Sequence, residues 1–117
     1  MSTVENERLV RAYIEAVWNK GNLDFIEAVW TADRVAECRA GWVSNHQFCP
    51  KGRFSIEDVI AQHNKVVVRW TFQGMHAWEL KSPVERSITV TGISIWTIKD
   101  ERLVDSHFAS EGPGIYE

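Results

Sequence analysis

Apolar side chains recur every three or four residues in the first thirty positions, which is the spacing of amphipathic helices. Over residues 4–19 one face of the predicted helix carries Leu9, Val10, Tyr13, Ile14, Val17 and Trp18. Ser2 and Glu5 have the spacing of a capping box, which favours a helix start here. Gly21 suits the end of this helix, because glycine readily adopts the left-handed conformation of a C-cap. A second, shorter helix is predicted over residues 23–30.

Beyond Asp33 the pattern changes to that of strands. Residues 34–48 are predicted to be extended, with a bend at Gly41. Runs with the character of strands follow, separated by short turns typical of antiparallel hairpins. The predicted strands are residues 54–63, 65–80, 86–98 and 102–111.

Helices that precede a series of hairpin-connected strands indicate the α+β class, in which helices pack on one face of an antiparallel sheet. Gly41, Gly74 and Gly92 lie inside the predicted strands, which favours a strongly bent sheet. A bent sheet covered by helices is a cone with an interior. The length of 117 residues suits a single domain, residues 1–117.

The composition is ordinary for a globular protein, with 44% hydrophobic and 25% charged residues. The net charge of −3 and the scattered basic residues argue against nucleic acid as a partner. Charged residues interrupt the N-terminal region, so we expect neither a signal peptide nor a membrane span there, and a cytoplasmic protein.

The two cysteines, Cys38 and Cys49, are not in a CxxC pair. His46 and His63 do not complete a metal-ligand spacing with them, so no metal is expected. Free thiols in a reducing compartment are the preferred interpretation. A disulfide would require the Cβ atoms to approach within about 4.5 Å, and this stays open.

Six tryptophans in 117 residues is a high number. Aromatic side chains bury large areas, and they also form the walls of pockets for apolar ligands. The tryptophans therefore indicate either an aromatic core or the lining of a pocket.

The final strand contains the most chemically interesting pattern, in the stretch LVDSHFASEGPG. Strict alternation places Leu103, Asp105, His107, Ala109 and Glu111 on one face, so His107 is expected to point inward. A histidine there could polarise a carbonyl. A carboxylate in a partly apolar pocket would have the raised pKa that acid/base catalysis uses. The alternatives are a hydrogen-bonded core histidine and a solvated Glu111.

His107 and Glu111 are four positions apart on a strand, which corresponds to about 13 Å at a rise of about 3.3 Å per residue. They therefore cannot hydrogen-bond to each other, and each needs a partner from another element. Glu37, His76 and Tyr13 are candidates for that role.

Three stretches of the chain resemble SnoaL-like polyketide cyclases of the NTF2-like superfamily. They are YIEAVWNKGNLDFIEAVW, VVVRWTFQGMHAWE and ITVTGISIWTIKDERLVDSH, and the resemblance covers most of residues 8–111. It implies a conical, cystatin-like α+β barrel with a pocket between the concave sheet and the helices. It also implies homodimers packed through the convex face of the sheet.

The same resemblance implies an acid/base residue late in the final strand, where Glu111 stands. His76 matches the histidine of a Gly-Thr-His turn in the family, and His107 stands where an aromatic residue is usual. The family usually carries a further helix between Trp42 and Phe54, and this chain is shorter there.

Three functions of different classes remain. The first is a cyclase or isomerase without a cofactor, in which Glu111, His107 or His76 moves a proton beside the carbonyl of an apolar compound. The second is a non-catalytic binder of a small apolar molecule. Its pocket wall would comprise Tyr13, Trp18, Trp30, Trp70, Phe72 and Trp96. The third is a dimeric interaction module whose vestigial pocket is filled by its own side chains.

Overall fold

The computed structural model of the chain describes residues 2–75 and 87–111. Helix α1 (Thr3–Tyr13) continues directly into a π-helix, η1 (Ile14–Asn19). The short helix α2 (Asp24–Val29) follows, and then a 3-10 turn, η2 (Ala32–Arg34), which leads into helix α3 (Val35–Phe48). The strands are β1 (Arg53–Gln62), β2 (Lys65–Met75), β3 (Ser87–Lys99) and β4 (Arg102–Glu111).

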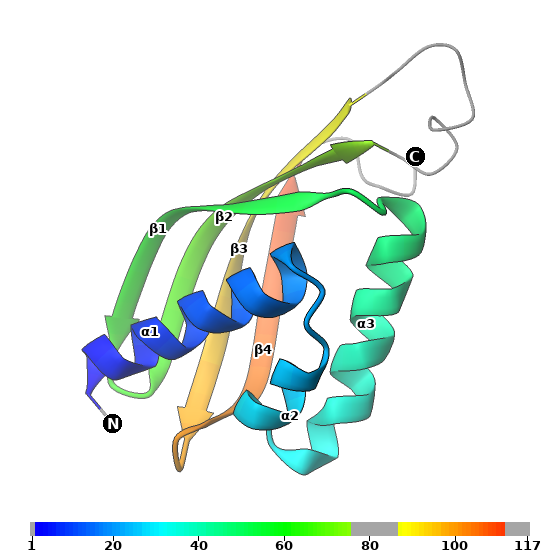
Figure 1. The fold of residues 1–117 in the computed structure, drawn as a ribbon. Coiled ribbons are helices and arrows are strands. Elements are labelled where there is room, and N and C mark those ends of the chain that lie inside the picture. The colour runs from blue at the N-terminus through cyan, green and yellow to red at the C-terminus, as the bar shows by residue number, and fades with distance from the viewer. Residues whose placement is uncertain (1, 76–86, 112–117) are drawn as a thin grey trace.

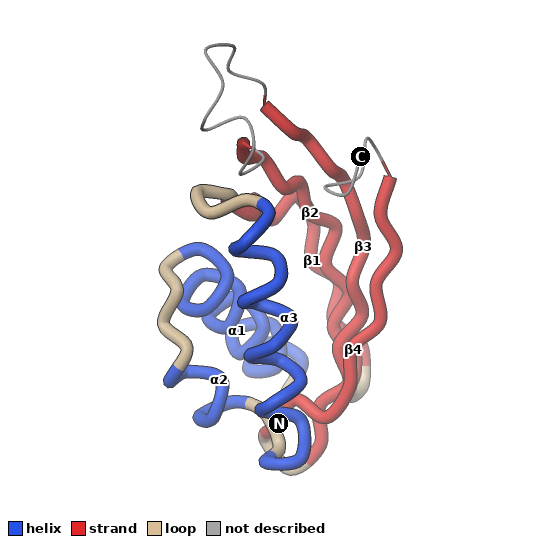
Figure 2. The backbone as a smooth tube through the Cα atoms, turned by 90° about the vertical axis from the view of Figure 1, so that its right-hand side faces the viewer, coloured by secondary structure: helices blue, strands red, loops and turns tan. Residues whose placement is uncertain are grey.

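The strands form one antiparallel sheet in the order β1-β2-β3-β4, and the helices form a layer on one of its faces (Figures 1 and 2). The predicted α+β class and the bent, helix-covered sheet are confirmed. The sheet curls around the helices without closing into a barrel, because β1 and β4 remain its two edges within the described residues.

The start and end of the first helix follow from the local signals in the sequence. The backbone N–H of Glu5 donates to Oγ of Ser2 over 3.1 Å, and the Glu5 side chain completes the capping box. Gly21 has a φ of 71°, the left-handed conformation that favours glycine. Most of the stripe between these ends is buried, with Val10 and Val17 fully inaccessible and Leu9 and Trp18 partly buried.

The π-helix changes the spacing at the end of this first helical segment. Residues five apart come onto one face, and the indole Nε1 of Trp18 donates to the hydroxyl of Tyr13 over 3.1 Å. One residue later, Asn19 exchanges two hydrogen bonds with the backbone of Phe54, of 2.9 Å from its Nδ2 and 2.7 Å to its Oδ1. The π-helix therefore joins the helical layer to β1 and sets the position of Trp18.

The prediction that residues 34–48 are extended, with a bend at Gly41, is wrong, because Arg34 ends η2 and Val35–Phe48 form α3. Val35, Cys38 and Trp42 are half-buried at helical spacing and pack on the core. Only these three positions define the apolar stripe, so it is too sparse to stand out among the charged residues around it. The indole of Trp42 fixes the helix by donating to the carbonyl of Val17 over 3.0 Å.

Both edge strands contain a bulge, whereas β2 and β3 pair without a register shift. In β1 the register shifts between Ile56 and Asp58, and in β4 the shift leaves Val104 as the extra residue opposite Thr97 and Ile98. One extra residue reverses which face every later side chain occupies.

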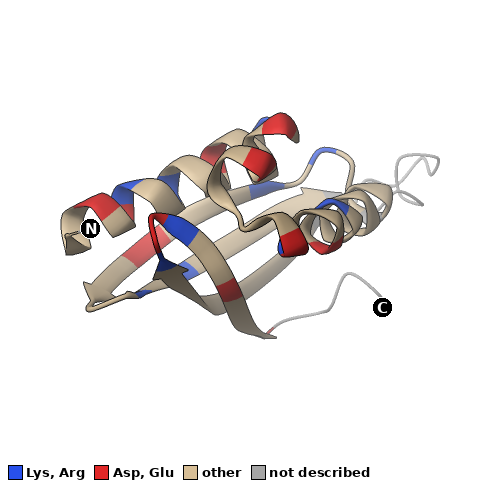
Figure 3. Ribbon diagram, turned by 90° about the horizontal axis from the view of Figure 1, so that it is seen from below, with Lys and Arg blue, Asp and Glu red and all other residues tan. Residues whose placement is uncertain are grey.

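The core lies between the helices and the concave face of the sheet. It contains the apolar stripe of α1 and η1 together with the inward side chains of the strands, among them Val66, Val68, Ile98 and Leu103. Lys, Arg, Asp and Glu are interspersed over the helices and the strands (Figure 3). Among the described residues, no helix has the length and apolar character needed to cross a membrane.

Candidate functional site

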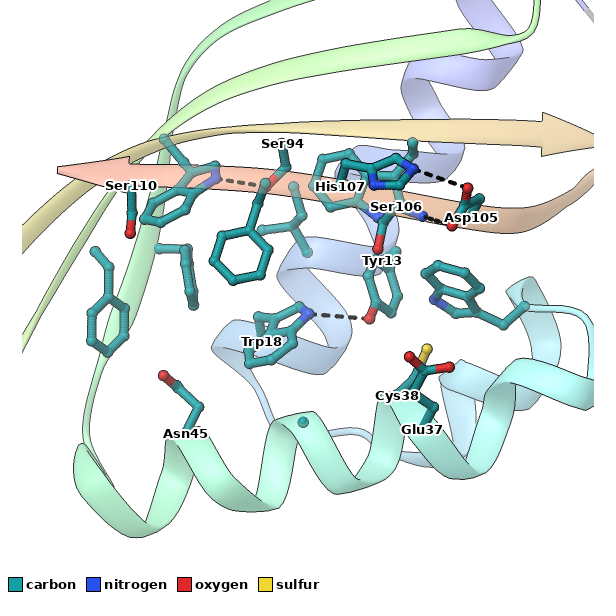
Figure 4. Close-up of a pocket in the computed structure, with 18 of the residues that line it drawn as sticks. Tyr13, Trp18, Glu37, Cys38, Asn45, Ser94, Asp105, Ser106, His107 and Ser110 are labelled. Atoms are coloured by element: carbon teal, nitrogen blue, oxygen red, sulfur yellow. Dashed lines mark hydrogen bonds and ion pairs between the residues drawn. The ribbon is translucent and has the colours of Figure 1, made fainter. Parts of the chain in front are cut away.

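A cavity of about 550 Å³ lies between α3 and the concave face of the sheet (Figure 4). Pockets for small organic molecules typically measure about 300–1,000 Å³. All six residues proposed from the sequence as a pocket wall line this cavity: Tyr13, Trp18, Trp30, Trp70, Phe72 and Trp96. The tryptophan-rich composition therefore serves both the core and the wall of one cavity. An open cavity of this size counts against a vestigial, self-filled pocket.

The proposed catalytic residues are placed less favourably. Glu111 is exposed at the last residue of β4, where its backbone carbonyl accepts from the Thr91 hydroxyl, and it is not part of the cavity lining. His76 lies outside the described residues. Of the two that the structure describes, His107 borders the cavity and Glu111 does not.

The expectation that His107 points inward is wrong, and the bulge at Val104 is the reason. Beyond the bulge, His107 pairs with Ile95, whose side chain is on the convex face. Its own side chain is 77% exposed. Ser106 pairs instead with the buried Trp96, and its hydroxyl is directed toward the cavity (Figure 4). His107 therefore lies at the rim of the cavity and not on its inner wall.

At this rim, four side chains from η2, α3 and β4 form a chain of ion pairs. Nε2 of His107 lies 3.1 Å from Oδ2 of Asp105, and Oδ1 of Asp105 lies 3.4 Å from Nη2 of Arg34. Nη1 of the same Arg34 lies 2.9 Å from Oε2 of Glu37. We call these residues the rim cluster. Glu37 was considered from the sequence as a partner for His107, and it contributes through Arg34 rather than directly.

Asp105 connects the two halves of the rim cluster, and its charge is stabilised there. Partial desolvation would raise the pKa of Asp105, but the charge of His107, the hydrogen bonds from Ser106 N–H and His107, and the charge of Arg34 together lower that pKa below its usual value of 3.8. The sequence contained a signal for this contact, because Asp105 and His107 are two positions apart on a strand and share a face.

Below the exposed rim cluster, polar groups are buried among aromatic rings. Burial raises the pKa of Tyr13 to about 12, against the opposing effect of the hydrogen bond from Trp18. The rings of Tyr13 and Trp30 pack edge to face with centroids 5.9 Å apart. We call Tyr13, Trp18 and Trp30 the inner end of the cavity. The sequence located these rings but gave no signal for the hydrogen bonds between them.

Two further groups of the cavity wall are polar. Ser94 is buried and accepts a hydrogen bond of 2.9 Å from Nε1 of Trp70. On α3, burial and then the charge of Glu37 raise the pKa of the Cys38 thiol to about 11, with Arg34 acting in the opposite direction. Cys38 and Cys49 are both free thiols. Within residues 2–75 and 87–111, no three His, Cys, Asp or Glu side chains gather as metal ligands.

Comparisons with known proteins point to one family. The family model described as SnoaL-like polyketide cyclase matches residues 7–110. No curated protein matches the chain in sequence.

Among solved structures, a candidate polyketide cyclase from Acidithiobacillus ferrooxidans is similar with a TM-score of 0.81 at 17% identity, over 99% of this chain and 95% of that one. IdmH, a candidate polyketide cyclase from Streptomyces antibioticus, gives a TM-score of 0.80 at 17% identity over 91% of each chain. AclR, a candidate hydroxylase from Streptomyces galilaeus, gives 0.79 at 17% identity over 94% of this chain and 77% of its own. At these identities the likeness establishes the fold.

Proposed function

The chain belongs to the SnoaL-like polyketide cyclase family, and from this premise we propose that it binds an apolar carbonyl compound and transfers a proton on it without a cofactor. The observation that carries the proposal is the aromatic cavity of about 550 Å³ with titratable groups at its rim. Flat aromatic walls suit a ligand of fused or conjugated rings, or a chain that folds into them. The reaction class is that of cyclases and isomerases, in which a base removes a proton beside a carbonyl.

We assign the base to His107. Asp105 accepts from the Nε2–H of the imidazole, and this leaves Nδ1 as the basic nitrogen. Nδ1 would take a proton from the carbon next to the carbonyl, and the C–H electron pair would move to form an enolate. The protonated imidazole then returns the proton to the enolate or to its aldol product. Against partial desolvation, the charges of His107 and Arg34 help to lower the pKa of Asp105, so that the ionised carboxylate can stabilise the imidazolium that forms.

The test uses 2-tetralone, a bicyclic ketone with exchangeable α-hydrogens, in deuterated buffer. Proton NMR follows the loss of the α-hydrogen signal in the presence of the protein. We expect exchange above the buffer rate, and roughly a 100-fold or greater loss of that excess in His107→Gln. Asp105→Asn should lose part of it, because the imidazole is then no longer held by a charge. Glu111→Gln, outside the cavity, is the matched control and should behave as the unchanged protein.

Two results would contradict the assignment. Exchange that persists in His107→Gln excludes His107 as the base. Exchange that is lost in Glu111→Gln would return the role to the position that the family resemblance indicated.

A non-catalytic binder is the second candidate, and the protonation of the inner groups favours it. With pKa values of about 12 and about 11, Tyr13 and Cys38 stay protonated near neutral pH. Neither is then available as a base, and the rim cluster is left as the source of one. Saturable quenching of tryptophan fluorescence by 2-tetralone, without any catalysed exchange, would establish binding alone.

A further inference from the structure

One buried donor at the inner end of the cavity is not used by the fold. The indole Nε1 of Trp30 is buried and has no hydrogen-bond partner among residues 2–75 and 87–111. Trp30 as a whole is 3% exposed, and it lines the cavity. Buried N–H groups are nearly always bonded in folded proteins, because a lost hydrogen bond to water is costly. An unused donor in the wall of a cavity therefore points to an acceptor that arrives with a ligand.

A second donor lies next to the first. The hydroxyl of Tyr13 accepts from Trp18, so its own hydrogen is left to donate, and burial keeps this group in its neutral form. The Trp30 N–H is near enough to lower the pKa of Tyr13, yet it does not reach hydrogen-bonding geometry with that oxygen. The bond from Trp18 also polarises the Tyr13 hydroxyl and makes it a better donor.

The surroundings of these two donors are neutral. The thiol of Cys38 is close enough to Tyr13 to contribute to its raised pKa, and this thiol also stays protonated near neutral pH. The nearest cation of the cavity lining, Arg34, is paired with Glu37 and Asp105 at the rim. A ligand carboxylate would find no free positive charge here, whereas an uncharged oxygen that only accepts hydrogen bonds would satisfy both donors.

We propose that Tyr13 and Trp30 form a subsite for a carbonyl oxygen, as in a ketone, quinone or ester, at the inner end of the cavity. This subsite deepens the proposed function and rests on it, because it presumes that an apolar molecule enters the cavity. It is a positioning site rather than the reacting one. The ligand is held by one carbonyl oxygen at Tyr13 and Trp30. The carbon that loses its proton, next to a second carbonyl, lies at the rim cluster beside His107. The ligand class is thus a flat compound with at least two oxygenated positions.

The experiment compares 9-fluorenone with fluorene, two tricyclic molecules that differ by one carbonyl oxygen. Dissociation constants come from the quenching of tryptophan fluorescence, and infrared difference spectra give the C=O stretch of bound fluorenone. We expect the protein to prefer fluorenone by roughly 3- to 10-fold and to shift its C=O stretch below the value in cyclohexane. Trp30→Phe and Tyr13→Phe keep the ring but remove one donor each. Each should reduce the preference and move the stretch back toward that value.

The matched control is Trp70→Phe, which removes an indole N–H from the same cavity wall that already donates to Ser94. It should alter the affinity for both probes similarly and leave the C=O stretch where it is. Equal binding of the two probes by the unchanged protein, or a C=O stretch at its cyclohexane value, would overturn the subsite while leaving the cavity as a binding site. Binding of neither probe would overturn the subsite and the proposed function together. Both measurements on the unchanged protein decide the question even if Trp30→Phe does not fold.

Discussion

The contact between Gly92 and Trp70 offers a quantitative test of how the cavity wall is packed. The two residues are paired across β2 and β3, and the indole lies over the glycine. A Cβ atom at position 92 would overlap Cζ2 of Trp70 and would lie 2.6 Å from its Cη2 and 2.8 Å from the carbonyl oxygen of Ala109. Gly92→Ala therefore forces the indole, or the edge strand, to move.

The indole has little freedom to do so. Its other side packs against Phe54 with ring centroids 5.1 Å apart, and its Nε1 is bonded to Ser94. Overpacking in a tight core typically costs about 1–3 kcal/mol. Breaking the hydrogen bond to Ser94 adds about 0.5–1.5 kcal/mol, so we expect Gly92→Ala to lower the free energy of unfolding by roughly 2–4 kcal/mol. With an unfolding entropy of about 0.25 kcal/mol/K for a chain of this length, Tm should fall by roughly 8–16 °C.

Thermal unfolding followed by circular dichroism measures this loss, and a double-mutant cycle shows whether the indole causes it. Trp70→Phe removes the atoms that the new Cβ would meet. In the Trp70→Phe background, Gly92→Ala should cost at least about 1 kcal/mol less than in the unchanged protein, with a residual cost from Ala109. Strictly additive effects would refute the reasoning, because they would show that the alanine acts through the backbone and not through the indole.

Two further predictions concern the surface of the sheet and the thiols. The homodimer expected through the convex face would bury the exposed Ile60 and Ile95. In light-scattering chromatography, Ile95→Glu should convert a species of twice 13.4 kDa into a monomer, whereas Val43→Glu on α3 should leave the dimer intact. If the unchanged protein is itself a monomer, this dimer is excluded. The pKa of Cys38 is raised from 9.0 to about 11, so in a Cys49→Ser variant its reaction with iodoacetamide should become about 10-fold faster per pH unit up to about pH 11. The stability that the protonated thiol contributes is complete below pH 9 and should be lost between pH 9 and 11. A rate that levels off near pH 9 in the folded protein would contradict the raised pKa.

The parts of the fold that the sequence predicts well are those governed by local signals. The first helix has a capping box at Ser2 and a left-handed glycine at position 21, and both act as expected. The last strand is predicted with the bounds that the structure gives it, Arg102–Glu111. The helical period is strong because most of the apolar stripe of α1 and η1 is buried. The last strand is mostly exposed beyond Asp105, and the turns on either side of it located its bounds. In α3 the buried face is interrupted by the cavity, and the helical period is correspondingly weak.

The sequence predicted the aromatic wall of the cavity correctly but not the direction of His107. Alternation places Trp70 and Phe72 on one face of their strand, and the family resemblance indicated that this face points to the interior, so these rings could be assigned to the core or the cavity wall. The direction of His107 depends on one extra residue, Val104, in an edge strand. A bulge changes neither the composition of the strand nor the length of its apolar pattern by a recognisable amount, so alternation gives the wrong face beyond it.

The bulge at Val104 also explains why the two kinds of chemistry in the cavity are separated. Before the bulge, the inward face of β4 carries Leu103, which closes the core; after it, this face carries Ser106, and the acidic and basic side chains of the strand remain at the rim. An ionisable group buried at the inner end would be desolvated without a partner, whereas Asp105 at the rim has Arg34 and His107 beside it. Recognition of a neutral oxygen is therefore favoured inside, and proton transfer is favoured at the rim. A ligand that uses both places has an oxygen among the buried donors and its reacting carbon at the exposed rim, and this division follows from the register of one edge strand.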